Sequence, residues 1–332
     1  MGMKVLITGC QGFIAKNLAQ HLKKQGHYVV GLDKQLKTGD PVFVDEFIGH
    51  NMENKITIEN DFDRVYHLSA DVPNSKFVGS AQMATGRSNP IQSIHALDFA
   101  AKNKSHFIYA CSAMMYNTDV QGHNGPDLNE DEHIWPAKPA GNIYGMEKLY
   151  NMQLVQEYAK YYDMKVALPI FHAMYGPYCD IFENSKVVAA MCVKIIKAPN
   201  MSEIEIWGDG TQIRSFCYID DLMIGLDKLI ENNIHIPINM GSDEAITMTQ
   251  LADMLIKISG KKIEKKYLPA GPAGCMRRNS DNTKIMKLTD WKPNCPLEYG
   301  LRITYDYVKR QVLTKEQLEF LEKKGPLTKQ DS

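Results

Sequence analysis

Tyr144 and Lys148 lie four residues apart and could together carry out acid–base chemistry. This spacing places both side chains on one face of the helix predicted over residues 144–162. A free phenol has a pKa of about 10, and a nearby ammonium group favours the phenolate and lowers that value. Such a tyrosine can accept a proton from a substrate alcohol. Ser112, just after the strand predicted over residues 106–110, could hydrogen-bond the reacting oxygen.

The spacing of this pair does not identify it alone, because Tyr161 and Tyr305 also precede a lysine by four residues. Only Tyr144 comes after a strand end that carries Ser112 and begins a helix that can lie beside the N-terminal half. The alternative interpretations are a half-buried helix tyrosine next to a solvated lysine, and a strand-end serine bonded to the backbone.

A glycine-rich turn near the N-terminus favours a dinucleotide site. Gly9-Cys10-Gln11-Gly12-Phe13-Ile14-Ala15 follows the buried strand predicted over residues 4–8 and opens the helix predicted over 13–25. Its G-x-x-G-x-x-A spacing is a variant of the dinucleotide fingerprint, whose glycines allow a tight turn and close approach to the pyrophosphate. The helix N-terminus supplies unpaired N–H groups and a positive dipole end. The alternative is a structural strand–turn–helix without a cofactor.

Asp33 ends the next predicted strand and lies 33 − 9 = 24 residues beyond Gly9. A carboxylate at this place accepts hydrogen bonds from the ribose hydroxyls and would repel a 2′-phosphate. We therefore expect NAD rather than NADP, although Lys34 next to Asp33 weakens this preference. A positive nicotinamide near Tyr144 would favour the phenolate further and accept a hydride from the same substrate carbon.

Strands alternate with helices over the first half of the chain. Further strands are predicted at residues 64–69, 106–110 and 166–171, and a helix at 91–104. This alternation predicts an α/β fold, a Rossmann-type doubly wound parallel sheet, with a smaller mixed α/β substrate domain. We expect an NAD-binding domain at 1–172, to which part of 214–240 returns, an interleaved substrate domain at 173–315 and a charged tail at 316–332. A long loop is predicted over 117–141.

Charge and composition exclude several kinds of partner. Lys and Arg number 38 against 39 Asp and Glu, which gives a net charge of −1 and no electrostatic case for binding nucleic acid. No run of 18 apolar residues predicts a membrane helix, and no signal-peptide pattern is visible, so we expect a cytoplasmic protein without membrane contact. The seven cysteines include no C-x-x-C pair, which favours reduced thiols over a metal site or a disulfide framework.

These residues together resemble the extended short-chain dehydrogenase/reductases, in the nucleotide-sugar epimerase/dehydratase branch. The resemblance rests on TGCQGFIA, Ser112 and YGMEK, and on the later motifs MYGP, WGDG and RSF. Within the branch, the chain is similar to GDP-mannose 3,5-epimerases through WGDGTQIRSFCYIDD, NMGSDEAITM, RRNSDNTKI and GLRITYDYVK. The resemblance implies bound NAD, oxidation of C4 of the sugar by the Tyr144, Lys148 and Ser112 set, and a homodimer.

The resemblance also implies two sets of binding residues. Cofactor contacts are expected at Gly9, Gln11, Gly12, Phe13, Ile14, Asp33, Asn51, Met52, Leu68, Ala70 and Lys148. Substrate contacts are expected at Met114, Lys76, His172, Lys186, Trp207, Gln212, Arg214 and Arg278, with the two arginines clamping the diphosphate. His172 has no ligand-spaced partner, which favours an ordinary pocket or core histidine, and the alternative for any single arginine is a solvated surface charge.

Met114 departs from the pattern of the epimerases that this chain resembles. These enzymes invert C3 and C5 with a lysine and a cysteine, and the matches SKVVAAMCVK and SAMMY place the lysine at Lys186 and the cysteine position at Met114. A thioether has no proton to give, and Cys111 should point to the opposite face of the strand. Met114 could also simply fill space in the core.

The leading hypothesis is therefore NAD-dependent oxidation at C4 of a GDP-linked manno-type hexose or heptose, without obligatory inversion at C3 and C5. The loop VPNSKF after Asp71 and the presence of Ala173, where the family usually has asparagine, suggest a changed sugar. One alternative is a GDP-mannose 3,5-epimerase in which another residue replaces the cysteine. An alternative of another class is a non-catalytic dinucleotide-binding sensor.

Overall fold

The large sheet of this protein is parallel and consists of seven strands in one continuous path. The computed structural model describes residues 2–36, 41–59, 61–72, 82–139, 143–181, 185–269 and 274–324. The strand order is β11-β7-β5-β4-β1-β2-β3, and the short β6 (Cys111–Ser112) also pairs with β7. The strands are β1 (Lys4–Thr8), β2 (Tyr28–Asp33), β3 (Glu46–Gly49), β4 (Arg64–His67), β5 (His106–Tyr109), β7 (Val166–Phe171) and β11 (Pro237–Met240).

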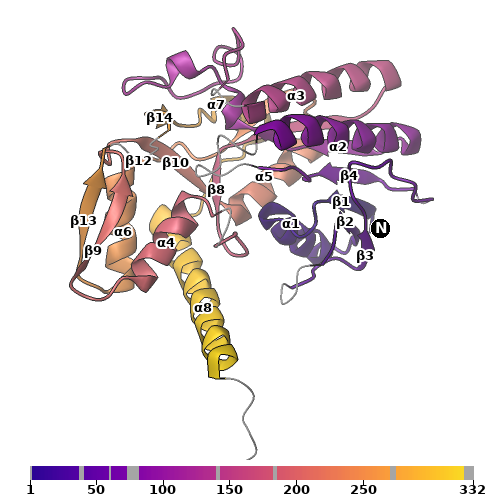
Figure 1. The fold of residues 1–332 in the computed structure, drawn as a ribbon. Helices are drawn as coiled ribbons and strands as arrows, with labels where there is room; N and C mark the ends of the chain where they lie inside the picture. The colour runs from indigo at the N-terminus through magenta and orange to yellow at the C-terminus, as the bar shows by residue number, and fades with distance from the viewer. Residues whose placement is uncertain are drawn as a thin grey trace, which may run out of the picture.

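Helices cover both faces of this sheet, as the apolar strands require. Figure 1 shows α2 (Gln82–Asn103) and α3 (Ile143–Tyr162) on one side, and α1 (Phe13–Lys24) and α5 (Ile219–Glu231) on the other. Each pair of helices packs with one of the two hydrophobic clusters of the core. Val5, Leu6 and Ile7 of β1 have no exposed surface, as expected of a parallel strand buried on both faces.

The second half of the chain builds a smaller set of sheets. Three strands pair with β10 (Ile213–Tyr218) in a four-stranded sheet, and two further strands, β9 (Ser202–Trp207) and β13 (Ile263–Leu268), pair separately. The strands that flank β10 are β8 (Ala173–Tyr175), β12 (Ala245–Thr247) and β14 (Arg277–Arg278), and the helices are α4 (Val187–Lys197), α6 (Met248–Ser259), α7 (Thr283–Thr289) and α8 (Leu297–Lys324). The predicted α/β class, with a parallel Rossmann-like sheet and a smaller mixed sheet, is confirmed.

Three predicted elements differ from the observed ones. Helix α2 begins at Gln82 rather than 91 and contains Pro90. Its first turns were missed because their buried positions, such as Ser88 and Asn89, are polar and are held by side-chain hydrogen bonds instead of apolar packing. Helix α8 continues through Lys324, into the predicted tail, and the predicted loop contains the short helices η1 (Ala113–Met115) and η2 (Thr118–Val120).

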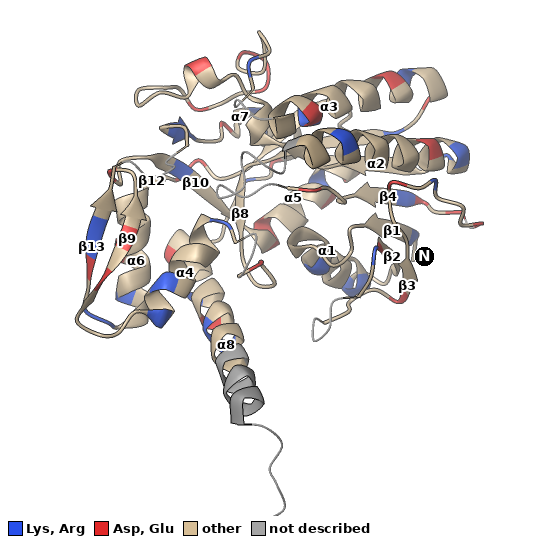
Figure 2. Cartoon of the chain, in the orientation of Figure 1, with Lys and Arg blue, Asp and Glu red and all other residues tan. Residues whose placement is uncertain are grey.

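The chain returns to the large sheet after entering the smaller part, because β11 pairs with β7 and α5 packs near α1. The domain boundaries given above stay a prediction. Acidic and basic side chains are interspersed over most elements (Figure 2), in keeping with the net charge of −1. Within the described ranges, no helix is both long and apolar enough to cross a membrane.

Candidate active site

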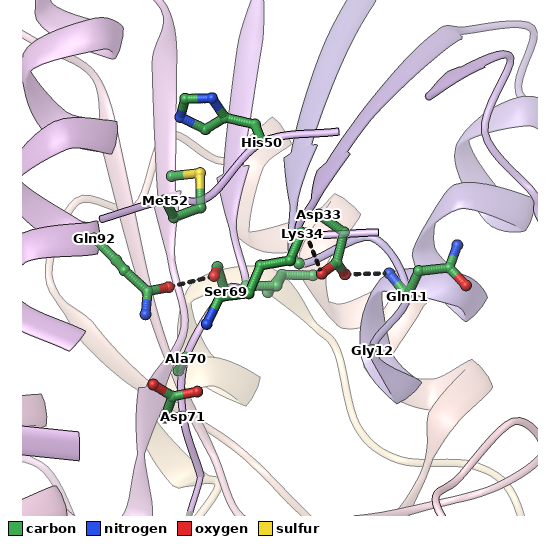
Figure 3. Close-up of a pocket in the computed structure, with 12 residues that line it drawn as sticks. Gln11, Gly12, Asp33, Lys34, His50, Met52, Ser69, Ala70, Asp71 and Gln92 are labelled. Atoms are coloured by element: carbon green, nitrogen blue, oxygen red, sulfur yellow. Dashed lines mark hydrogen bonds between the residues drawn. The ribbon is translucent and has the colours of Figure 1, made fainter. Parts of the chain in front are cut away.

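A cavity of about 270 Å³ opens at the carboxyl ends of β1, β2 and β4. In parallel sheets this edge is the usual place of ligand sites. Figure 3 shows the side chains of this cavity, which come from the glycine turn, the ends of β2 and β3, the segment after β4, and α2. The lining residues are Gly9, Gln11, Gly12, Asp33, Lys34, His50, Met52, Leu68, Ser69, Ala70, Asp71 and Gln92.

The glycine turn depends on two properties of glycine, a positive φ angle and the absence of a Cβ. Gly9 has φ of +70°, and a Cβ built there would lie 2.8 Å from the Cα of Ser69. Gly12 precedes the first residue of α1, and no side chain caps that helix. The turn therefore brings the strand ends close together and presents the free N–H groups of α1.

The Asp33 carboxylate is held in place by backbone donors. The Gln11 N–H donates to Oδ2 at 3.0 Å and the Lys34 N–H donates to Oδ1 at 2.8 Å (Figure 3). Oε1 of Gln11 is buried and has no hydrogen-bond partner within the described part of the chain. Uncapped helix N–H groups, a fixed carboxylate and an unpaired buried oxygen fit the phosphates and ribose of a dinucleotide.

A second cluster joins the start of α3 to β6 and η1. Gly145 makes this possible, since a Cβ there would lie 2.5 Å from the Met114 carbonyl oxygen and would push the helix away. The hydroxyl of Ser112 accepts the Met114 N–H at 3.2 Å and also hydrogen-bonds the side chain of Tyr144. Burial, together with the charge of Glu147, raises the pKa of Tyr144 above its ordinary value, although the charge of Lys148 and the hydrogen bond from Ser112 act to lower it.

Lys148 is buried against aromatic rings. Its Nζ lies 4.8 Å from the ring centroid of Tyr109 and 5.8 Å from that of Tyr144. Burial works against its charge, but the neighbouring Tyr109, Glu147 and Tyr144 raise the pKa of Lys148 above its ordinary value. The ammonium group therefore stays positive beside the Tyr144 phenol.

Two arginines from the smaller part of the fold lie side by side at the edge of this cluster. Arg214 of β10 and Arg278 of β14 are register partners in a parallel pair. Nη1 of Arg278 lies 2.8 Å from the Met114 sulfur, and its Nε donates to Oε1 of Gln121 at 2.9 Å. Neither arginine forms an ion pair with a carboxylate among the described residues. Burial lowers the pKa of both guanidinium groups, and the charge of Arg214 adds to this effect on Arg278.

The family of the chain follows from comparison with known proteins. Residues 5–241 match the NAD dependent epimerase/dehydratase family. The chain belongs to this family. It is similar to a GDP-mannose 3,5-epimerase of Arabidopsis thaliana, with 35% identity over 93% of this chain and 83% of that protein. It is an NAD-dependent nucleotide-sugar epimerase/dehydratase of the extended short-chain dehydrogenase/reductase type.

Solved structures agree with this assignment. A UDP-glucuronic acid 4-epimerase of Bacillus cereus, solved with a UDP-sugar and NAD, is 26% identical, has a TM-score of 0.79 and covers 93% of this chain and 100% of its own. A UDP-glucose 4-epimerase of Thermotoga maritima has the same fold, with a TM-score of 0.83 at 24% identity and coverage of 93% and 100%. The family is NAD-dependent, and a related structure binds NAD.

Most predicted cofactor residues of this epimerase/dehydratase come together in the cavity. Gly9, Gln11, Gly12, Asp33, Met52, Leu68 and Ala70 line it. Phe13 and Ile14 begin α1 and pack against the core, and Lys148 belongs to the Tyr144 cluster. Asn51 is exposed, and its Oδ1 accepts the Glu53 N–H at 3.1 Å. Its neighbour His50 lines the cavity and was not predicted.

The predicted substrate residues are more dispersed. His172 is buried, and its Nε2 lies 2.8 Å from Oδ1 of Asn239. Its Nδ1 has no hydrogen-bond partner among the described residues, and burial lowers the pKa of the ring to about 4. Gln212 is also buried, and its Oε1 has no hydrogen-bond partner in the described part of the chain. Trp207 is half-buried at the end of β9, where Nζ of Lys194 lies 5.2 Å above its ring. Lys76 lies outside the described residues.

Lys186 and Cys111 have opposite environments. Lys186 directly precedes α4 and is exposed. Its pKa is nevertheless lowered, because the surrounding chain partly shields its ammonium group from water. Cys111 is 1% exposed on β6, and burial raises its pKa. A buried thiol of this kind is a poor acid–base group.

Proposed function

We propose that this enzyme oxidises C4 of a GDP-linked manno-type hexose or heptose without obligatory inversion at C3 and C5. The observation that carries the proposal is Met114, whose thioether lies against Arg278 and follows Ser112 by two residues. At this position a thioether cannot exchange a proton with the sugar. Similarity to GDP-mannose 3,5-epimerases at 33–35% identity supports the guanine nucleotide.

Tyr144 would act as the base in this reaction. Its phenol lies beside the Ser112 hydroxyl and a permanently charged Lys148, both of which favour loss of its proton. Ser112 would hold the C4 hydroxyl toward Tyr144, and Tyr144 would take the hydroxyl proton. NAD, held by the cavity at Gly9, Gly12 and Asp33, would supply the hydride acceptor when bound.

Arg214 and Arg278 would hold the diphosphate of the substrate. Two half-buried guanidinium groups without carboxylate partners in the described structure match a group with two negative charges. The buried, unpaired polar atoms of Gln212, His172 and Asn279 lie in the same part of the fold and could pair with the nucleotide or the sugar.

A homodimer is part of the proposal, through the helix pair that the family resemblance implies. Large apolar side chains remain exposed on α2 and α3, which supports a partner on that surface. They are Met83, Met146, Tyr150, Tyr161 and Tyr162. Sedimentation of the purified protein would give the mass of one chain if this surface has no partner.

The test of the proposed reaction is incubation with GDP-mannose in deuterated water, together with its heptose counterpart. We expect reduced nicotinamide to accumulate on the enzyme with little deuterium at C3 and C5 of the recovered sugar. The Tyr144→Phe variant should oxidise C4 at least ~100-fold more slowly, the usual scale of general-base loss. Tyr161→Phe is the matched control, because Tyr161 is 82% exposed on the same helix and also precedes a lysine by four residues.

A second candidate is 3,5-epimerisation, which the 35% identity to the Arabidopsis enzyme favours. Rapid deuterium incorporation at both C3 and C5 would support that candidate and contradict the proposed reaction. A non-catalytic sensor is disfavoured by the intact Tyr144, Lys148 and Ser112 cluster. It would gain support if Tyr144→Phe bound NAD normally and every measurable function stayed unchanged.

A further inference from the structure

A buried carboxylate lies between the two ionisable residues at the start of α3. Glu147 is 4% exposed, and both of its oxygens accept hydrogen bonds from amide groups. Nδ2 of Asn89 donates to Oε1 at 2.8 Å, and Nδ2 of Asn151 donates to Oε2 at 2.7 Å. Burial raises the pKa of Glu147, whereas the two donated bonds and the charge of Lys148 favour its ionised form.

Asn89 extends this network to the wall of the cofactor cavity. Its Oδ1 accepts the Asp71 N–H at 2.7 Å, and its Nδ2 donates to the Asp71 carbonyl oxygen at 3.2 Å. Asp71 lines the cavity and directly follows Ser69 and Ala70, which also line it. A continuous chain of hydrogen bonds therefore runs from the cofactor cavity through α2 to the helix that carries Tyr144 and Lys148.

A purely structural role explains this arrangement poorly. Burying a carboxylate is costly unless charge and hydrogen bonds offset it, and an apolar side chain would fill the space between α2 and α3 more cheaply. The opposite charge that acts on Glu147 is that of Lys148, on the adjacent position of the same helix. The titratable groups that share this region are Lys148 and Tyr144 on α3, Tyr109 on β5 and Cys111 on β6; burial raises the pKa of Tyr144, Tyr109 and Cys111 and keeps them neutral.

We propose that Glu147 is a positioning residue, which ties the helix of Tyr144 and Lys148 to the cofactor-lining segment at Asp71 through Asn89. Its negative charge also balances the buried ammonium group of Lys148. The inference rests on the proposed roles of Tyr144 and Lys148 in C4 oxidation. It extends them, because it makes the distance between the base and the cofactor depend on one buried carboxylate.

Glu147→Gln tests the proposal with little change of shape. The new amide group keeps one acceptor oxygen for Asn89 but loses the charge, and its NH₂ has an acceptor at Asn151 only when that side-chain amide turns to present Oδ1, which has no partner among the described residues. We expect NAD affinity, measured by titration calorimetry, to fall about 10-fold, the scale of one lost charge-assisted hydrogen bond. We also expect the alkaline-rising limb of the C4 oxidation rate to move to lower pH, because Glu147 raises the pKa of Tyr144.

The rescue variant is Glu147→Gln/Asn151→Asp, in which the glutamine NH₂ can donate to the new carboxylate one helical turn away. We expect it to recover most of the NAD affinity. Glu157→Gln, on the exposed face of α3, is the control and should leave NAD affinity unchanged. Unchanged NAD affinity in Glu147→Gln, or no recovery in the double variant, would overturn the proposal.

The two proposals can fail separately. If the wild-type enzyme oxidises no GDP-sugar, the proposed function is wrong, but the affinities for NAD still decide the role of Glu147. If oxidation occurs and Glu147→Gln lowers its rate equally at every pH while NAD binds normally, the positioning role is refuted and the function stands.

Discussion

The substitution Met114→Cys should introduce proton exchange at the sugar ring. It places a thiol at the position to which the family resemblance assigns a cysteine, on η1 and two residues after Ser112. Once C4 is a ketone, the hydrogens at C3 and C5 are acidic, and only a suitably placed acid–base group is missing. We expect deuterium exchange from solvent at one or both carbons to rise at least ~100-fold over the wild-type enzyme.

The environment of Met114 should activate the new thiol. The methionine sulfur is 2.8 Å from Nη1 of Arg278, and a cysteine sulfur, one bond closer to the backbone, would lie about 4–5 Å away. At an effective dielectric constant of about 20, that separation corresponds to about 3–4 kcal/mol of attraction, or about 2.5–3 pKa units. Partial exposure and desolvation reduce the benefit, so a thiol pKa near 7.5 instead of about 8.5 is expected.

The assay follows deuterium in recovered GDP-mannose by NMR, with oxidation at C4 measured in parallel as formation of reduced nicotinamide. Met201→Cys is the control, since it adds a thiol at a position that is 82% exposed. If Met114→Cys still oxidises C4 but exchanges no more deuterium than the wild type, the missing acid–base group is not what limits inversion. Fast deuterium exchange at C3 and C5 in the wild-type enzyme would refute the premise that Met114 leaves the site without an acid–base group.

Two further substitutions test the cluster and the turn. Lys148→Met should raise the pKa of Tyr144, because it removes the charge that lowers it, and should move the rising limb of the oxidation rate to higher pH; a limb that stays in place would contradict this. Gly9→Ala should lower the free energy of unfolding by about 2–3 kcal/mol in urea titrations, since it combines left-handed backbone strain with a Cβ 2.8 Å from Ser69. Gly26→Ala, with φ of +83° and open space, separates the two effects and should cost only about 1 kcal/mol; equal losses would show that strain alone matters.

The N-terminal half of the fold was predictable because its signals are local. Each signal lies within a few residues of the feature that it predicts. This holds for the buried strand at Lys4–Thr8, for the glycine turn and for the carboxylate at the end of β2, Asp33. The same holds for Tyr144 and Lys148, whose spacing along one helix sets their common face. Ser69 and Asp71 could have been found by the rule that ligands bind at the carboxyl ends of parallel strands, since both follow β4.

The remaining contacts depend on pairings that no local pattern encodes. Arg214 and Arg278 meet only because β10 and β14 pair in a particular register across 64 residues of chain. Gln92 reaches the cavity from the middle of α2, and Glu147 finds Asn89 on a neighbouring helix. Buried polar residues of this kind interrupt the apolar periodicity from which helices are predicted, which is also why the start of α2 was placed too late.

Met114 affects the geometry of the site as well as its acid–base capacity. Its sulfur accepts from the Arg278 guanidinium, whose Nε is already held by Gln121, so two side chains fix the orientation of this arginine before any ligand is present. A shorter cysteine would no longer contact Nη1, so of these two side chains only Gln121 would hold the arginine. With methionine at this position the enzyme lacks one acid–base group, but the side chain of Arg278 is oriented before the substrate binds. Such a site suits a reaction in which the diphosphate and C4 must be held in place but both faces of the ring need not be protonated.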